Sequence, residues 1–157
     1  MFTGVFVAGV FRSVTVSDTM EYAKSLAQHF MPGGVVCLTG GLGCGKTVFA
    51  KGFAQGLGIE RDVTSPTFII LNEYADEGAR IPLYHFDVYR INSIEEMDDT
   101  GFEHYFYQGG VCLVEWAEIV KDIIPEGAVW VNIYKNAGLG ENYRKIRITG
   151  GNDDSGN

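Results

Sequence analysis

The chain has 157 residues, of which 46% are hydrophobic and 20% charged, so it can bury the core of one globular domain. Its 12 basic and 20 acidic residues give a net charge of −8, which disfavours nucleic-acid binding through phosphate neutralisation alone and binding to anionic membranes. No apolar stretch reaches the roughly 20 residues of a membrane span, and the first basic residue follows the apolar N-terminus, unlike in a signal peptide.

Cysteine usage points to a reducing compartment. The three cysteines, Cys37, Cys44 and Cys112, form no CxxC pair, and Cys37 and Cys112 lie inside apolar runs. This pattern disfavours a disulfide framework or a zinc site, and we expect a cytoplasmic protein.

The first third of the chain alternates strand and helix patterns. Arg12–Val16 alternates in polarity and predicts a short strand. Asp18 and Glu21 have the spacing of a capping box, which predicts that a helix begins at Asp18. Val35–Thr39 is a short apolar, β-branched run typical of a buried strand. The helical pattern of Thr47–Leu57 follows after a glycine-rich loop.

The remainder predicts further strands and one short helix. The predicted strands are 68–74, 81–87, 111–114, 129–133 and 145–148, and Ser93 opens a short helix through a second capping box. We therefore expect an α/β sandwich with a mixed sheet flanked by helices. Residues 1–149 are expected to form one domain, and 150–157 a disordered polar tail.

The glycine-rich segment 40–47 matches G-x-x-x-x-G-K-[ST] at every fixed position. Glycines let successive backbone N–H groups converge on phosphate oxygens. Lys46 supplies a cation for the β- and γ-phosphates, and Thr47 supplies a hydroxyl for Mg²⁺ at a helix N-terminus. The alternative is a glycine-rich turn with an incidental Lys-Thr pair. The expected nucleotide-contacting residues of this segment are Gly40, Gly41, Leu42, Gly43, Cys44, Gly45, Lys46, Thr47 and Val48.

Two acidic residues end apolar strands and are candidates for the chemistry of the bound phosphates. Asp87 closes one strand and Glu115 closes another. Either could ligate Mg²⁺ or orient the attacking water, and the alternative for each is an ordinary solvated acid. The N-K-x-D signature of guanine-specific GTPases is absent, and no arginine cluster follows the predicted P-loop helix as in a kinase lid.

Four blocks in this order carry a family resemblance: 42–47 (Leu-Gly-Cys-Gly-Lys-Thr), 63–68 (Val-Thr-Ser-Pro-Thr-Phe), 84–90 (Tyr-His-Phe-Asp-Val-Tyr-Arg) and 114–116 (Val-Glu-Trp). The chain resembles the TsaE (YjeE) family of small bacterial ATPases, and the resemblance implies a P-loop α/β sandwich with a mixed, mainly parallel sheet. The resemblance implies ATP and Mg²⁺ as ligands and a role in threonylcarbamoyladenosine synthesis on tRNA. It also implies the TsaB–TsaD heterodimer as partner, with tRNA reached only through that complex and no DNA.

The resemblance also implies residue roles, carried over position by position. It gives catalytic roles to Lys46, Asp87 and Glu115, and metal-binding roles to Thr47, Asp87 and Glu115. Ser65 and Thr67 match a nucleotide-sensing loop, Thr19 and Arg144 match positions near the nucleoside, and Trp116 matches a tryptophan beside the acidic residue.

Three loop positions depart from the family pattern. Gly41 stands where the family usually has Asp, Val48 where it has a second Thr, and Cys44 where Ala is common. We expect an accessible Cys44 thiol that ATP protects, whereas His85 is interpreted as structural. The departures keep open a nucleotide-dependent binding switch with little hydrolysis, and a small-molecule P-loop kinase is a further alternative. The acidic segment 91–110 is either a docking surface or a solvated helix.

Overall fold

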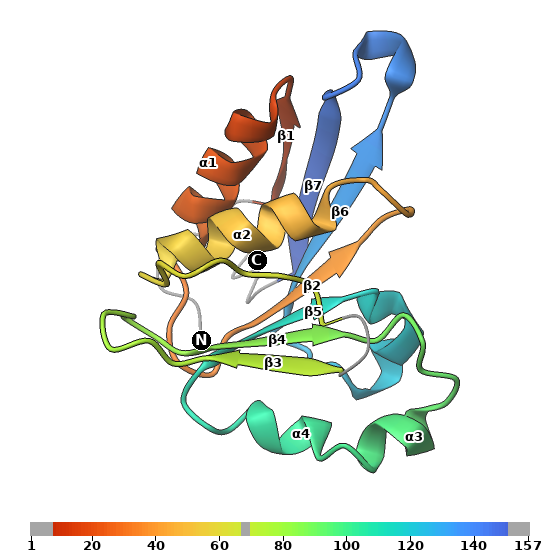
Figure 1. Cartoon of the computed structure of the whole chain (residues 1–157). Helices are drawn as coiled ribbons and strands as arrows, with labels where there is room; N and C mark the ends of the chain where they lie inside the picture. Colours follow the sequence, from red (N-terminus) through yellow and green to blue (C-terminus); the bar gives the residue numbers. More distant parts are fainter. Residues whose placement is uncertain (1–7, 67–69, 151–157) are drawn as a thin grey trace, which may run out of the picture.

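The fold is a seven-stranded sheet with helices on both sides (Figure 1). The computed structural model describes residues 8–66 and 70–150. In chain order the elements are β1 (Gly9–Ser13), α1 (Val16–Ala27), β2 (Val35–Thr39), α2 (Lys46–Gly56), β3 (Leu71–Tyr74), β4 (Leu83–Asp87), α3 (Ile94–Asp98), α4 (Phe102–Tyr105), β5 (Val111–Glu115), the 3-10 helix η1 (Ala117–Ile123), β6 (Val129–Lys135), the 3-10 turn η2 (Ala137–Leu139) and β7 (Arg144–Gly150).

The sheet has the order β1-β7-β6-β2-β5-β4-β3. The four central strands, β6, β2, β5 and β4, run parallel, whereas β3 and the β7–β1 pair extend the sheet antiparallel at its two edges. The predicted mixed, mainly parallel α/β architecture is confirmed. Because parallel strands end at one edge, the carboxyl ends of β2, β4 and β5 lie together, and the segment joining β2 to α2 lies at that edge.

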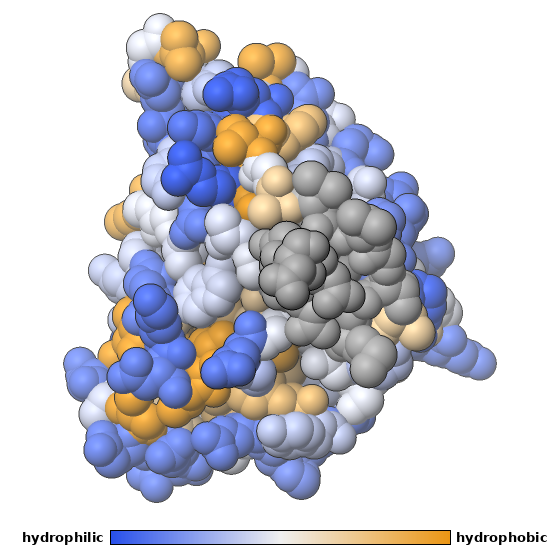
Figure 2. Space-filling view, turned by 180° about the vertical axis from the view of Figure 1, so that it is seen from behind, coloured by the Kyte–Doolittle hydropathy of each residue, from blue (hydrophilic) through white to orange (hydrophobic). Residues whose placement is uncertain are grey.

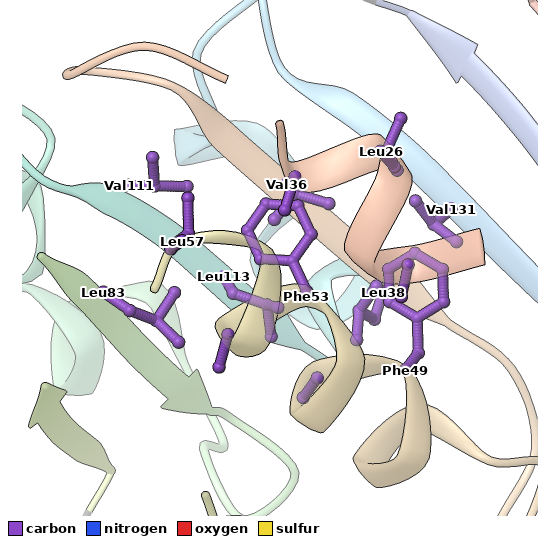
Figure 3. Close-up of a cluster of buried hydrophobic side chains, with 14 of the residues drawn as sticks. Leu26, Val36, Leu38, Phe49, Phe53, Leu57, Leu83, Val111, Leu113 and Val131 are labelled. Carbon is purple, nitrogen blue, oxygen red and sulfur yellow. The ribbon is translucent and has the colours of Figure 1, made fainter. Parts of the chain in front are cut away.

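Two apolar clusters fill the space on either side of the sheet. One contains α1 and α2 packed on the sheet, and Figure 3 shows part of it, with Phe49 and Phe53 of α2 near Leu38 of β2 and Leu113 of β5. The other lies beneath α3, α4 and η1 and includes Met97. The helices α1 and α2 cross very closely, because a Cβ on Gly52 would stand 2.3 Å from the carbonyl oxygen of Met20.

The start of α1 differs from the prediction. The helix begins at Val16, and its N-cap is Thr15, whose hydroxyl accepts a hydrogen bond from the Asp18 amide while the Asp18 carboxylate accepts one from the Thr15 amide. The capping box is therefore Thr15 with Asp18, and the predicted box of Asp18 with Glu21 is wrong. The strand before it is also shifted, because β1 can pair with β7 only as far as Ser13, which lies opposite the first residue of β7.

The other predicted elements are found with small shifts at their ends. The segments 35–39, 111–114, 129–133 and 145–148 all lie in strands, and Ser93 caps α3 through the Glu96 amide. The strand predicted over 68–74 is described only from residue 70, because 67–69 lie outside the described residues. Gly150 ends β7, and the rest of the predicted tail, 151–157, also lies outside the described residues. None of the helices in the described part of the chain has the length and apolar character to cross a membrane.

Candidate functional site

The glycine-rich segment forms a tight loop between the buried strand β2 and helix α2. Gly40 has φ +145°, and a Cβ there would lie 2.6 Å from both the Cys44 Sγ and the Ile133 carbonyl oxygen, so only glycine fits. Gly45 precedes α2 with φ +105°, a left-handed conformation that glycine adopts without strain. The first turn of α2 therefore leaves backbone N–H groups without intrahelical acceptors at the carboxyl edge of the sheet.

Lys46 is turned back onto its own loop. It is 7% exposed, and its Nζ donates to the carbonyl oxygens of Gly40 at 2.8 Å and Gly41 at 2.9 Å. The same ammonium lies 3.9 Å from the ring centroid of Trp116, which is a cation–π geometry. Trp116 follows β5 directly and has φ +60°, unlike any other non-glycine residue in the described ranges. The loop cation is therefore held in place by two carbonyl oxygens and one aromatic ring.

A chain of hydrogen bonds joins the loop to the end of β5. The Thr47 hydroxyl lies 2.8 Å from the Ser65 hydroxyl, which donates to Glu115 Oε2 at 2.7 Å. His85 Nε2 lies 3.1 Å from the same Oε2. Glu115 is 2% exposed and His85 is fully buried, whereas Thr47 and Ser65 are half-buried, so the network runs from the loop into the interior. Three of the predicted residues, Thr47, Ser65 and Glu115, therefore contact one another in turn. The structure adds His85 as a fourth member of the network.

Asp87 ends β4 directly beside Glu115, its partner in the parallel register. Burial raises the pKa of the Asp87 carboxyl above its ordinary value, and the Glu115 charge raises it further. The Tyr89 backbone N–H, at 3.0 Å, and the more distant charge of Lys46 act in the opposite direction. Asp87 lines a pocket of ≈ 370 Å³ together with Leu42 and Trp116, so its carboxyl faces the mouth of the loop.

Arg144 ties the loop to the β6–β7 hairpin. Its Nε donates to the Cys44 carbonyl oxygen at 2.6 Å, and its Nη1 donates to the carbonyl oxygens of Glu141 and Tyr143. The structure therefore places this predicted residue at the loop, where it fixes the backbone just before Gly45. The expectation of an accessible Cys44 thiol is wrong, because that side chain is 3% exposed and points into the apolar cluster under α2.

The remaining predicted residues divide between the loop mouth and the interior. Leu42 is 81% exposed, and Gly41 has open space where a side chain would stand. Val48 lies in the first turn of α2 and Gly43 at the exposed tip of the loop. Thr19 is buried, and its hydroxyl lies 2.7 Å from that of Ser13, so the structure joins it to β1 and not to the loop. Thr67 lies outside the described residues.

Sequence reasoning missed two contacts of this site. His85 was interpreted as structural, yet its Nε2 contacts Glu115, while its Nδ1 is a buried atom without a hydrogen-bond partner. The only signal in the sequence was its place two residues before Asp87, which puts both side chains on the same face of β4. The contact of Lys46 with Trp116 joins residues far apart in the chain, and no local pattern indicates it.

The oxygen groups at the carboxyl edge are of the kind that Mg²⁺ prefers. Thr47 offers a hydroxyl at the start of α2, and Asp87 and Glu115 offer carboxylates from adjacent strands. No cluster of three or more His, Cys, Asp or Glu side chains suited to a metal occurs within residues 8–66 and 70–150. These residues fit a magnesium ion that is bound mainly through phosphates and water, and they do not form an all-protein metal cage.

The fold and the loop define an α/β protein whose strand-to-helix loop matches the P-loop pattern. A profile of the family described as threonylcarbamoyl adenosine biosynthesis protein TsaE matches residues 13–146. The chain belongs to the TsaE family, as its sequence motifs indicated. This family is involved in tRNA threonylcarbamoyladenosine biosynthesis.

Individual relatives agree with this assignment. The tRNA threonylcarbamoyladenosine biosynthesis protein TsaE of Bacillus subtilis is 45% identical over 138 residues, which is 88% of this chain and 83% of the relative. The TsaE protein of Treponema pallidum is 41% identical over 77% of this chain and 87% of its own length. The crystal structure of Bacillus subtilis YdiB superposes with a TM-score of 0.74 at 37% identity, covering 96% of this chain and 90% of that structure.

Proposed function

We propose that this chain binds Mg·ATP in the loop between β2 and α2, hydrolyses it slowly, and thereby supports turnover of the TsaB–TsaD complex during threonylcarbamoyladenosine modification of tRNA. The observation that carries the proposal is the hydrogen-bonded chain from the loop hydroxyl of Thr47 through Ser65 to the buried carboxylate of Glu115. A purely structural turn does not require a carboxylate at 2% exposure that is connected to the second residue of the following helix.

The loop residues account for phosphate binding in this proposal. The N–H groups at the start of α2 and the Lys46 ammonium donate to phosphate oxygens, and the helix dipole favours the negative charge. Arg144 holds the Cys44 carbonyl and so keeps the loop backbone in the curled form that aims these N–H groups. Thr47 and Asp87 would hold a magnesium ion, and the ion would neutralise part of the phosphate charge.

Glu115 is assigned the orientation of the attacking water. Ser65 and His85 both contact its Oε2, so within the described residues Oε1 is the oxygen left to accept a hydrogen bond from water. The two contacts fix the carboxylate plane, and such fixed positioning lowers the reorganisation needed at the transition state. Asp87 stands beside it at the end of β4, where it can hold the metal or a metal-bound water.

Two alternatives are retained because loop residues depart from the family pattern. A nucleotide-dependent switch would bind ATP and dock to its partner with little hydrolysis, and Gly41 and Val48 favour it. A small-molecule kinase would transfer phosphate to an acceptor, but we find no arginine-rich lid after α2. We propose the cytosol as compartment, because all three cysteines are free thiols.

Phosphate release from Mg·ATP tests the proposal, measured for the purified chain alone and with the TsaB–TsaD pair added. We expect slow release alone and a several-fold change with the pair. Lys46→Ala should weaken ATP binding or turnover at least about tenfold, or about 1.4 kcal/mol. Lys51→Ala is the matched control, because Lys51 lies on the same helix in an exposed ion pair with Asp62.

The outcomes separate the three functions. Tight ATP binding without phosphate release, both alone and with the TsaB–TsaD pair, supports the switch. Gly41 and Val48 are then the residues to replace by the Asp and Thr that the family usually has. Label from the γ-phosphate on a small acceptor supports the kinase. Equal ATP affinity and turnover in Lys46→Ala and Lys51→Ala would refute nucleotide binding in this loop.

A further inference from the structure

The outer part of the sheet, formed by β1, β7 and β6, presents a second surface on the face away from α1 and α2. Along these strands Val131, Ile133, Ile146 and Ile148 point into the cluster beneath α1 and α2. The alternate residues therefore stand on the opposite face. These are Val10, Arg12, Trp130, Asn132, Tyr134, Lys145, Arg147 and Thr149, of which Val10, Arg12, Tyr134, Arg147 and Thr149 are exposed.

This outer part of the sheet is strongly basic in an otherwise acidic chain. The three strands contain five cationic residues, Arg12, Lys135, Arg144, Lys145 and Arg147, and no acidic residue. Apart from Arg144, which contacts the loop, these cations form no ion pair with any residue in the described ranges. Charges separated by more than about 8–10 Å are screened at physiological salt, so the local sign matters more here than the net charge of −8.

The cations gather around one depression. Arg12, Lys135, Lys145 and Arg147 line a hollow of ≈ 540 Å³ together with Tyr134 and Tyr143. The strand register explains their proximity, because Lys145 of β7 lies directly between Arg12 of β1 and Tyr134 of β6. Figure 2 views the molecule from behind, and hydrophilic residues gather over the β6–β7 end in its upper part.

A pocket with aromatic rings lies beside this basic depression. It has a volume of ≈ 700 Å³, and its lining includes Trp116, Trp130, the loop residues Gly40 and Gly41, and one charge of each sign, Glu118 and Lys121. Tyr134 lines both hollows and is 47% exposed. The two hollows are therefore neighbours, and together they combine cations with aromatic rings.

We propose that this face, from the basic depression to the aromatic pocket, binds a single-stranded segment of RNA. Its phosphates lie among Arg12, Lys145 and Arg147, and its bases stack on Tyr134 and Trp130. Cations alone would suit an acidic peptide equally well, but aromatic rings beside them, the exposed Tyr134 and the half-buried Trp130, offer the stacking surfaces that unpaired bases require. The choice of RNA rests on the proposed function in tRNA modification. It differs from the expectation from net charge, which disfavoured direct contact between this chain and tRNA.

Fluorescence anisotropy of a labelled, unstructured 12-nucleotide RNA, titrated with the purified chain without ATP, tests the proposal. We expect saturable binding that weakens with salt. Lys145→Glu combined with Arg147→Glu should weaken binding at least about tenfold and reduce the salt slope by about 2. Tyr134→Ala should weaken it about fivefold or more without altering that slope. Arg147→Glu alone, at an exposed side chain, is the reserve variant if the double change impairs folding.

The matched control is Lys24→Glu combined with Lys51→Glu, which makes the same change in net charge on α1 and α2. Its binding should stay within about twofold of the unaltered chain. Absence of saturable binding, or equal weakening in both double variants, would overturn the proposal. The proposal would also be overturned, in favour of an acidic protein partner, by two results together. These are displacement of the RNA by poly-glutamate of equal charge and an unchanged RNA affinity in Tyr134→Ala. Because the assay contains no nucleotide, its failure leaves the ATPase proposal standing.

Discussion

Removal of the Glu115 carboxylate should reveal how firmly the buried network is built. Glu115→Ala leaves the half-buried Ser65 hydroxyl and the buried His85 Nε2 without their acceptor. Leaving a buried donor without its acceptor costs about 1–3 kcal/mol, and more where a charged group is involved, so the loss of both contacts together costs about 3–5 kcal/mol. We therefore expect Glu115→Ala to lower the free energy of unfolding by about 3–5 kcal/mol, a large part of a typical total of about 5–15 kcal/mol.

Glu115→Gln is the informative comparison, because an amide oxygen at the position of Oε2 still accepts one hydrogen bond. Replacing a charged acceptor by a neutral one costs about 1–2 kcal/mol, so the glutamine variant should remain folded. We expect it to bind ATP with nearly unchanged affinity and to lose most of its turnover, because the amide cannot act as a base toward water.

Urea unfolding followed by tryptophan fluorescence measures both free energies, and Trp116 next to Glu115 is a local reporter of this region. Calorimetric titration with ATP and phosphate release measure the functional part. If Glu115→Ala unfolds within about 0.5 kcal/mol of the unaltered chain, the two contacts contribute little and the network argument is refuted. If Glu115→Gln retains full turnover, Asp87 takes over the catalytic role.

Four further predictions address other parts of the molecule. Gly52→Ala should destabilise the chain by about 1–3 kcal/mol in urea unfolding, because its Cβ would stand 2.3 Å from the Met20 carbonyl oxygen and α1 must move away. Arg144→Lys should weaken ATP binding in calorimetry, because a single ammonium cannot reach both Cys44 and the hairpin carbonyls; unchanged affinity would contradict that anchoring role. Gly41→Asp should leave stability within about 0.5 kcal/mol, since its side chain enters open space, and any gain in phosphate release would identify this departure from the family as limiting. The native chain should react with a thiol reagent at pH 8 only as it unfolds: Cys44 is 3% exposed, and burial raises the pKa of Cys112 to about 12, far above the assay pH, so its thiolate is scarcely populated.

Much of the site could be predicted from local patterns. The loop needs glycines, a lysine and a threonine at fixed spacing, and the carboxylates end apolar runs, so 40–47, Asp87 and Glu115 could all be named from the sequence. Parallel strands then bring those run ends to one edge of the sheet without further information. The family resemblance supplied Ser65 and Arg144, for which no local rule predicts a role.

The wrong predictions concern positions where two local motifs are both possible, or where the deciding contact joins residues far apart in the sequence. Both Thr15 with Asp18 and Asp18 with Glu21 have capping-box spacing, and only the end of the β1–β7 pairing decides between them. Cys44 sits in a loop expected to face solvent, but the turn at Gly40 directs its thiol inward. The basic face of β1, β7 and β6 escaped notice because net charge averages over surfaces that lie far apart.

The inward turn of Lys46 has a consequence for ligand selectivity. Any anion that reaches the loop competes with the carbonyl oxygens of Gly40 and Gly41 for the same ammonium. Those two bonds are worth about 1.5–3 kcal/mol each, so a lone phosphate exchanges one set of partners for another with little net gain. A triphosphate would also accept hydrogen bonds from the N–H groups at the start of α2, and these would offset the loss of the carbonyl contacts. If the loop binds ATP as proposed, this competition makes it discriminate against free phosphate without any residue devoted to that task.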